Sequence, residues 1–321
     1  MPSFKKTKYP INKSAADSKG SIQGRNNFLP QVVGSKTLST GFNRVLIIGL
    51  GLIGGSFSLD LHERQLADHI VGYDIEKNVC RQAKKLGVID EVLASLNTDL
   101  TKYDLVILSV PVLSMTDLMR YLSKRLNQNA LVINVASTQK SIMSVADVLF
   151  PNGNFIGTHP MAGKENSGIK AVQCDLFIGA PCLIVKSKKT KSKYIKKAAA
   201  MWRKVGAHTQ IVSSEVHDKN VAIVSHLPHL LAFSLMKTAF DEMGNKAIRA
   251  AAGRSFREHT RIAAPNAHLW TQILLENSEF ILKAVRGFTS ELMSFEKMLV
   301  KKNKLALKKK LHSIALQRRK I

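Results

Sequence analysis

Apolar positions change their spacing near residue 213, and this change divides the sequence into two regions. Between residues 44 and 212, short apolar runs alternate with longer amphipathic segments. The runs have the length of buried strands, and the segments between them have the length of helices. Such alternation is typical of a mostly parallel sheet with helices on both faces. The pattern therefore predicts a doubly wound α/β region followed by a helical one.

Seven strands and the helices between them are expected in the first region. The strands are predicted at residues 45–48, 69–73, 104–109, 130–135, 154–157, 181–185 and 208–212. A basic helix is expected at residues 190–204, and further helices at 215–240, 241–251, 267–282 and through the lysine-rich end. Residues 1–42 are rich in Ser, Lys, Asn and Gly, which predicts a disordered extension.

Three glycines follow the first predicted strand at G-x-G-x-x-G spacing: Gly49, Gly51 and Gly54. A helix is expected from Ile53 toward residue 64, and the second strand ends in Asp74. The glycines suit a tight turn, close approach of the backbone to a pyrophosphate, and close helix–strand packing. An acid at Asp74 would accept hydrogen bonds from an adenosine ribose and repel a 2′-phosphate. The order of these parts predicts a Rossmann-type dinucleotide-binding domain that favours NAD over NADP.

This interpretation fixes a set of domains and cofactor-binding residues. The domains are a basic extension at residues 1–42, the dinucleotide-binding domain at 43–212, and a helical substrate and dimerisation domain at 213–321. The expected cofactor-binding residues are Gly49, Gly51, Leu52, Ile53, Gly54, Asp74, Ser109, Val110 and Pro111.

Composition is that of an ordinary soluble protein: 45% of the 321 residues are hydrophobic and 22% are charged. We expect no membrane span, because no apolar run approaches about 20 residues, and no secretory signal, because no apolar segment follows the basic start. The cysteines, Cys80, Cys174 and Cys182, lack metal-ligand spacing. Three scattered cysteines are typical of the reducing cytoplasm.

The net charge of +25 is concentrated in three segments. Residues 1–44 contribute +7, residues 186–204 contribute +9, and residues 297–321 contribute +10. Nucleic-acid binding is one interpretation of such charge. Because these runs contain few aromatic residues and no recognisable binding motif, a solvated lysine-rich surface is favoured.

Several predicted strands are followed by polar residues whose presence packing in a hydrophobic core does not explain. Ligands of open α/β sheets bind beyond the carboxyl ends of the strands, so Ser137 and His159 would face the reactive end of the cofactor. An imidazole there suits proton removal from a hydroxyl. A structural, hydrogen-bonded histidine is the alternative for His159 taken by itself.

The first helices of the second region carry further candidates. His217, Ser225, His226 and His229 lie near its start, and Pro228 is expected to kink the helix and turn its polar face into a cleft. Because no carboxylate or cysteine has fitting spacing, no metal is expected. Arg257 and Arg261 are one helical turn apart, and an arginine there would clamp a carboxylate through two hydrogen bonds.

Six blocks in order, GLGLIGGS, VGYD, SVPV, THPMAGKENSG, SHLPHLLAF and FREHTRIAAPNAHLW, resemble the prephenate and arogenate dehydrogenases of tyrosine biosynthesis. The resemblance covers residues 44–300. It implies a Rossmann-type domain, a helical domain that forms a homodimer, and NAD-dependent oxidative decarboxylation of prephenate to 4-hydroxyphenylpyruvate. No regulatory domain is expected after residue 300, and no chorismate mutase segment before residue 44.

The resemblance also implies roles for individual residues. His159 would bind the ring hydroxyl and help to remove its proton, and Ser137 would assist at the hydroxyl and the nicotinamide. Arg261 would hold a substrate carboxylate, and Trp270 would line the pocket. The other substrate-binding residues would be His217, Ser225, His229 and Lys164, although Lys164 could instead pair with Glu165.

Two alternatives remain open from the sequence. Many relatives have an acid-Val-Gly-Ser-x-Lys block where this chain has Asn134 to Gln139, and the basic ends fall outside the family pattern. The enzyme could be an arogenate or dual-specificity (cyclohexadienyl) dehydrogenase, which differs in the substrate side chain. The non-enzyme alternative is a basic NAD-binding protein that acts on nucleic acid.

Overall fold

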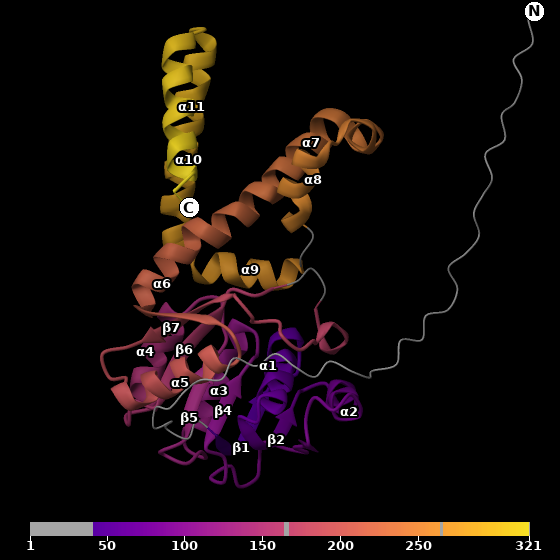
Figure 1. Cartoon of the computed structure of the whole chain (residues 1–321), viewed down its shortest axis with the longest axis vertical. Coiled ribbons are helices and arrows are strands. Elements are labelled where there is room, and N and C mark those ends of the chain that lie inside the picture. Colours follow the sequence, from indigo (N-terminus) through magenta and orange to yellow (C-terminus); the bar gives the residue numbers. More distant parts are fainter. Residues whose placement is uncertain (1–40, 164–166, 264–265, 321) are drawn as a thin grey trace, which may run out of the picture. The chain divides into compact units, whose positions relative to one another are not determined.

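The computed structural model describes residues 41–163, 167–263 and 266–320. In Figure 1 the colours of the first region run from indigo through magenta to salmon, and those of the helices that follow run on through orange to yellow. Of the predicted extension at residues 1–42, residues 1–40 lie outside the described part of the chain. Lys164 also lies outside it.

An eight-stranded sheet forms the first region, in the order β3-β2-β1-β4-β5-β6-β7-β8. The strands are β1 (Phe42–Ile48), β2 (Ala67–Tyr73), β3 (Glu91–Val92), β4 (Leu105–Leu108), β5 (Leu131–Asn134), β6 (Phe155–Pro160), β7 (Pro181–Lys186) and β8 (His208–Ser213). Neighbours pair in parallel except β6 and β7, which are antiparallel. The strand order reverses at β1 and β4, and open α/β sheets bind ligands at such a point.

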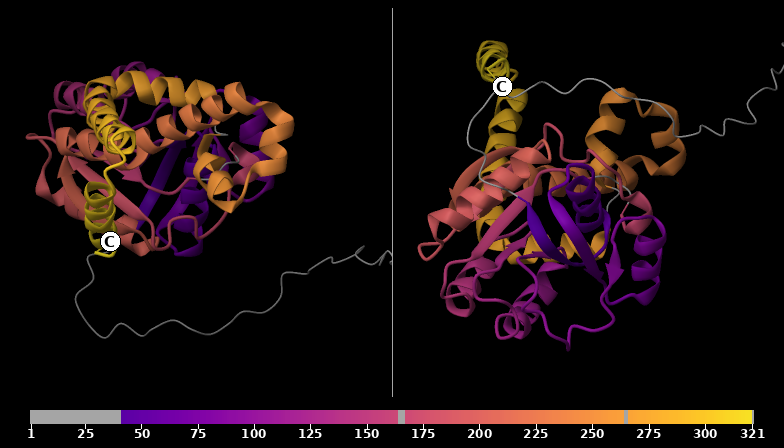
Figure 2. Two further views of the ribbon diagram at one scale, coloured as in Figure 1. Left: turned by 90° about the horizontal axis from the view of Figure 1, so that it is seen from above. Right: turned by 60° about the horizontal axis from the view of Figure 1, so that its bottom comes forward.

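Helices cover both faces of this sheet (Figure 2). They are α1 (Leu52–Glu63), α2 (Lys77–Lys85), α3 (Val112–Leu122), α4 (Lys140–Leu149), the short turn η1 (Ile169–Ala171) and α5 (Ser192–Lys204). Successive side chains of a strand point to opposite faces. Val45 and Ile47 accordingly join an apolar cluster with α1 and α5, whereas Leu46 and Ile48 join a second cluster with α3 and α4.

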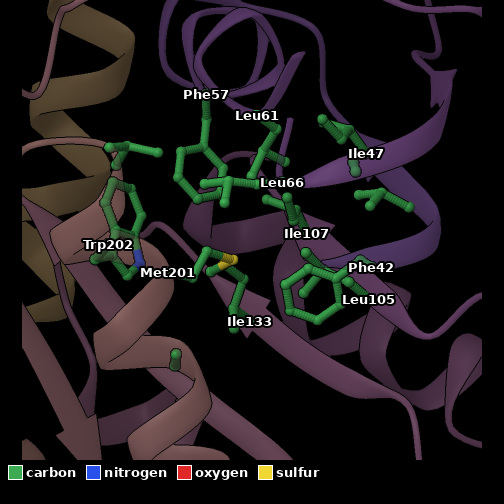
Figure 3. Packing of buried hydrophobic residues seen from close by; sticks show 14 of the residues in the cluster. Phe42, Ile47, Phe57, Leu61, Leu66, Leu105, Ile107, Ile133, Met201 and Trp202 are labelled. Carbon is green, nitrogen blue, oxygen red and sulfur yellow. The ribbon is translucent and has the colours of Figure 1, made fainter. Parts of the chain in front are cut away.

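Aromatic packing joins α1 to α5 over the sheet. Figure 3 shows Phe57 and Leu61 of α1 near Trp202 of α5. The rings of Phe57 and Trp202 are stacked with centroids 4.2 Å apart, and Phe177 meets the edge of Trp202 at 5.1 Å. All three side chains are fully buried. The basic helix predicted near residues 190–204 is therefore amphipathic: its apolar face completes the core, and Lys193, Lys196 and Lys204 face outward. Lys197 is half-buried, with its ammonium 4.0 Å from the centre of the Phe42 ring.

The second region consists of helices throughout its described residues. They are α6 (Ser214–Val221), the π turn η2 (Ala222–His226), α7 (Leu227–Ala251), α8 (Arg254–Thr260), the 3-10 turn η3 (Arg261–Ala263), α9 (Ala267–Glu276), α10 (Ser278–Val300) and α11 (Lys304–Arg318). By length and composition the continuous stretch Ser214–Ala251 could cross a bilayer. One such helix is weak evidence for a membrane, and this one carries the buried polar residues His217, Asp218 and His226.

The structure confirms the mostly parallel sheet and the helical second region, but some predicted helix boundaries are wrong. The helix expected at residues 215–240 is interrupted by the π turn before Pro228, whose ring nitrogen has no hydrogen to donate. The break expected near residue 240 falls instead at Gly244, where φ is 70°. The helix expected at 267–282 ends at Asn277, and β3 was not predicted.

We expect Trp202→Ala to lower the free energy of unfolding by about 3–5 kcal/mol, because it leaves a cavity between Phe57 and Phe177. Trp202→Phe should cost less than half as much, since it keeps the stacked ring and removes an indole N–H without a partner among the described residues. Urea unfolding measures both. Ile211→Ala on β8, where the side chain is half exposed, is the control. Equal losses for Trp202→Ala and Ile211→Ala would contradict this account of the core.

Candidate active site

The glycine-rich turn between β1 and α1 packs against the end of β4. A Cβ atom at Gly49, where φ is 94°, would lie 2.1 Å from the carbonyl oxygen of Ser109, and one at Gly54 would lie 2.1 Å from that of Gly49. At Gly51 a Cβ would meet nothing within 4 Å. The first and third glycines are thus required by packing within the protein, whereas the second borders open space.

The N-terminus of α1 and Asp74 border this open space. Gly51 is the N-cap of α1 and provides no side chain to cap the first turn, which includes Leu52, Ile53 and Gly54. Asp74 accepts hydrogen bonds from the backbone N–H groups of Leu50 (2.9 Å) and Glu76 (3.0 Å), so its carboxylate lies against the turn. Unsatisfied N–H groups and the helix dipole suit a diphosphate. The residues present therefore fit a bound dinucleotide.

Ser109, Val110 and Pro111 follow β4 directly, at the same edge of the sheet. Ser109 and Val110 are half-buried, and Pro111, the N-cap of α3, is exposed. They adjoin the turn because the carbonyl of Ser109 contacts Gly49. The predicted cofactor-binding residues thus lie around the carboxyl ends of β1, β2 and β4.

A buried amide pair shapes the loop that holds Ser137. The side chains of Asn134 and Gln139 exchange two hydrogen bonds, with N–O distances of 3.1 and 2.8 Å, and both are fully buried. Gln139 also donates to the carbonyl of Ala136, and Asn134 accepts from the Ala136 N–H. These contacts fix the turn in which Ser137 is half-buried. In this chain the loop is held by neutral amides.

His159 lies near the carboxyl end of β6 and joins a line of three side chains. Its Nδ1 atom is 2.9 Å from Nε2 of His217, and Nδ1 of His217 is 2.6 Å from Oδ1 of Asp218. His159 is 7% exposed, His217 is fully buried, and Asp218 is 2% exposed. Burial, followed by the neighbouring imidazoles of His217 and His226, lowers the pKa of His159 well below its ordinary value. His159 is therefore neutral at physiological pH.

Both oxygens of Asp218 also accept hydrogen bonds from the start of α4. The N–H of Gln139 donates to Oδ1 (2.8 Å), and that of Lys140 donates to Oδ2 (2.9 Å). Nearby, Lys140 pairs with Glu279 (2.8 Å), and Ser141 donates to Glu276 (3.0 Å). Helices α6, α9 and α10 of the second region are thus joined to the first region at the N-terminus of α4.

A second polar group surrounds Trp270. The ring of His229 is stacked on the Trp270 indole at 3.7 Å, and His226 meets the indole edge at 6.1 Å. Asn277 bonds both the Asp218 carbonyl (2.8 Å) and Nδ1 of His226 (3.1 Å). Burial lowers the pKa of His226 to about 4. Neutral imidazoles therefore line this part of the molecule.

His229 and Arg261 mark the more open side. His229 is half-buried, and its Nδ1–H donates to the carbonyl of Ser225 (2.9 Å), which leaves Nε2 for another partner. Burial lowers the pKa of His229, the hydrogen bond to Ser225 opposes this, and the charge of Arg261 lowers it further. Arg261 is exposed in the turn η3, which follows α8. Arg261 thus lies close enough to His229 to affect its charge.

The structure brings most of the predicted residues together, and it adds some that the sequence analysis missed. His159 and His217 are in contact, His229 and Trp270 are in contact, and Ser137 lies on the loop that the Asn134–Gln139 pair holds. The missed residues are Asp218 and Asn277. Asn134 and Gln139 were expected only as a departure from the family block, without their contact with each other. Among the described residues, no group of three or more His, Cys, Asp or Glu is arranged to hold a metal ion.

Two family models match the chain in sequence. The nucleotide-binding domain of prephenate dehydrogenase matches residues 57–211, and the dimerization domain of prephenate dehydrogenase matches residues 213–313. Together they cover most of the chain and meet close to its change from α/β to helical structure.

Individual relatives agree with the family models. A cyclohexadienyl dehydrogenase of Zymomonas mobilis is 31% identical over 79% of this chain and 87% of its own length. A prephenate dehydrogenase of Bacillus subtilis is 32% identical over 74% of this chain and 65% of its own length. The crystal structure of prephenate dehydrogenase from A. aeolicus with hydroxyphenyl propionate and NAD+ superposes with a TM-score of 0.81, at 32% identity, over 87% of this chain and 98% of that one. The chain is a member of the prephenate dehydrogenase family.

Proposed function

We propose that the protein catalyses the NAD-dependent oxidative decarboxylation of prephenate to 4-hydroxyphenylpyruvate in tyrosine biosynthesis. The observation that carries this proposal is the buried, neutral His159, which lies at the same edge of the sheet as the dinucleotide-binding turn. A base is needed there because oxidation of a ring alcohol removes both a hydride and a proton.

The protein's own groups would hold the cofactor by its diphosphate and ribose. The open space beside Gly51 would admit the diphosphate to the N-terminus of α1, and Asp74 would accept hydrogen bonds from the ribose hydroxyls. When bound, NAD supplies the acceptor for the hydride of the substrate. Ser109, Val110 and Pro111 would contact it beyond the end of β4.

His159 would accept the proton of the substrate hydroxyl at Nε2. Within the described residues this nitrogen makes no hydrogen bond, whereas Nδ1 is held by His217. A neutral imidazole in a buried setting accepts a proton as the carbonyl develops, and Ser137 would donate a hydrogen bond to the same oxygen. Loss of CO2 from the ring then makes it aromatic, so the protein mainly has to position the reacting groups.

Arg261 would bind a substrate carboxylate through paired hydrogen bonds. His229, Ser225 and Trp270 would line the rest of the pocket, with the Trp270 indole presenting an apolar wall. We keep Lys164 as a further candidate for a carboxylate contact. His217, which is fully buried, would act on the substrate through His159.

Arogenate, or both substrates, is the second candidate. It is favoured by the relative from Zymomonas mobilis, which is named a cyclohexadienyl dehydrogenase. The two substrates differ in a keto or amino group on the side chain, and neutral His229 could accept a hydrogen bond from the amine.

We propose a cytoplasmic homodimer. The family model for the dimerization domain covers residues 213–313, and large apolar side chains are exposed on α7 and α10 in this range: Leu235, Phe240, Met243, Leu292, Met293 and Leu299. A second copy would remove such surface from water. We do not propose nucleic acid as a partner, because the comparisons assign the chain to a dehydrogenase family.

Purified protein with NAD should form NADH on addition of prephenate, followed by absorbance. His159→Asn should lower kcat by about 10²–10⁴-fold, the usual contribution of a general base, without weakening NAD binding.

Because protonation of His159 abolishes its role and its pKa lies well below 6.5, kcat/KM should fall only as the pH drops well below 6.5. A strong preference for arogenate would favour the second candidate. No turnover on either substrate, with NAD still bound, would refute the proposed function.

Gly51→Ala should weaken NAD binding by about tenfold or more without altering the fold, because its Cβ would occupy the space beside the diphosphate. Gly41→Ala is the matched control, since a Cβ there also meets nothing within 4 Å. Calorimetric titration with NAD measures both variants. Unchanged affinity in Gly51→Ala would place the diphosphate elsewhere.

Arg261→Ala should raise KM for the substrate by about 10–100-fold, the range expected when a hydrogen bond to a charged group is lost. KM for NAD should change less than about twofold. Arg257→Ala tests the neighbouring arginine, whose Nε donates to the carbonyl of Ala252, and should change neither constant appreciably. If Arg261→Ala raised both KM values equally, Arg261 would not be the carboxylate clamp.

A further inference from the structure

The buried line from Asp218 through His217 to His159 determines which nitrogen of each ring carries a proton. A carboxylate only accepts hydrogen bonds, so Nδ1 of His217 must donate its proton to Asp218 across 2.6 Å. In a neutral ring the other nitrogen is then an acceptor. Nε2 of His217 therefore accepts from Nδ1–H of His159, across 2.9 Å. His159 is left with an unprotonated Nε2.

We propose that Asp218 is a positioning residue for the reaction: through His217 it holds His159 in the one neutral form whose Nε2 can take the substrate's proton. This inference rests on the proposed function, because it assigns the role of Asp218 in that reaction. With 2% of its surface exposed, Asp218 is too buried to contact a ligand, and among the described residues no hydrogen bond joins its side chain to His159. Its effect on the chemistry passes through His217.

Asp218 is itself fixed in its orientation. Its Oδ1 and Oδ2 atoms accept from the N–H groups of Gln139 and Lys140, at the positive end of α4. Its backbone carbonyl accepts from Asn277. The carboxylate is therefore held in place against His217.

The same line can carry the positive charge that the reaction creates. The hydroxyl O–H bond breaks as the Nε2–H bond of His159 forms, while the hydride leaves for NAD and the carbon–carbon bond to CO2 breaks. His159 is then doubly protonated. Its Nδ1 proton can shift to Nε2 of His217, and that imidazolium lies against the Asp218 carboxylate. The proton later returns along this line and leaves from Nε2 of His159 to solvent.

A structural role is the competing explanation, because Asp218 also caps α4. The variant Asp218→Asn distinguishes this structural role from the proposed positioning role. If the Asn amide nitrogen faces His217, it donates to Nδ1, the His217 proton moves to Nε2, and His159 must then carry its proton on Nε2. His159 can no longer act as a base. Turnover should fall at least about 100-fold, as expected when a base is held in the wrong form, while NAD affinity stays within about twofold.

His217→Gln provides the decisive background, because a Gln carbonyl can accept from Nδ1–H of His159 without help from Asp218. We expect this variant to retain at least about a tenth of wild-type turnover, and His217→Leu to lose as much as Asp218→Asn. In the His217→Gln background, Asp218→Asn should cost less than about threefold. Such non-additivity shows that Asp218 acts through residue 217. Equal losses in both backgrounds would overturn the proposal.

Glu279→Gln is the matched control for the helix end, since it breaks the exposed ion pair with Lys140 and should leave turnover unchanged. Should Asp218→Asn not fold, the comparison of His217→Gln with His217→Leu decides: equal turnover in these two would overturn the proposal.

Nitrogen-15 NMR of the histidine rings tests the inference without turnover. His159 and His217 should both carry their proton on Nδ1 in the wild-type protein, and both should switch to Nε2 in Asp218→Asn. A wild-type His159 protonated on Nε2 would overturn the proposal. A wild-type protein inactive on prephenate and arogenate would refute the proposed function, and these spectra would still decide the arrangement of protons.

Discussion

A buried carboxylate is stable only when its oxygens are hydrogen-bonded, and the described part of the chain satisfies this requirement at Asp218 in a way that ties its two regions together. The donors come from the start of α4, which follows β5, and from His217 on α6. Neither region could provide this environment by itself. His159 is positioned by β6 of the sheet, and the hydrogen bond at its Nδ1 depends on this contact between the sheet region and α6.

Most of the sheet could be predicted from the sequence, because the residues that determine each strand and turn lie close together in the chain. The glycine turn, the alternating strands and the inward face of α5 each follow from residues within a few positions of one another. Errors occurred where a distant contact decides the local structure. Asn277 ends α9 while its side chain bonds Asp218 and His226, which lie about fifty residues or more away in sequence. Residue pattern by itself cannot indicate such an ending.

The candidate site was predictable as a set of residues but not as a hydrogen-bonding network. His159, Arg261 and Trp270 lie in motifs that the family resemblance supplies. Asp218 has no such signal, since an acid on an amphipathic helix is usually solvated. In sequence, Asn134 and Gln139 are a departure from the acid and lysine of relatives, and in the structure the two buried amides hydrogen-bond each other. Replacing both members together avoids an unpaired buried charge.

The π turn Ala222–His226 has a consequence for how this helix tolerates insertions and deletions. Each residue of an α-helix turns the chain by about 100°, and a π turn absorbs one extra residue, so the residues beyond it are rotated by about that amount. With the extra residue, His217 and His229 lie within roughly 20° of one another around the axis; in an uninterrupted α-helix the difference would be roughly 120°. Deletion of one residue here would leave a regular, well-bonded helix. It would also keep His217 and His229 within roughly 20° of one another, because eleven α-helical steps turn the chain as far as twelve steps that include the π turn. The π turn thus allows this segment to vary in length by one residue without moving the two histidines to different faces.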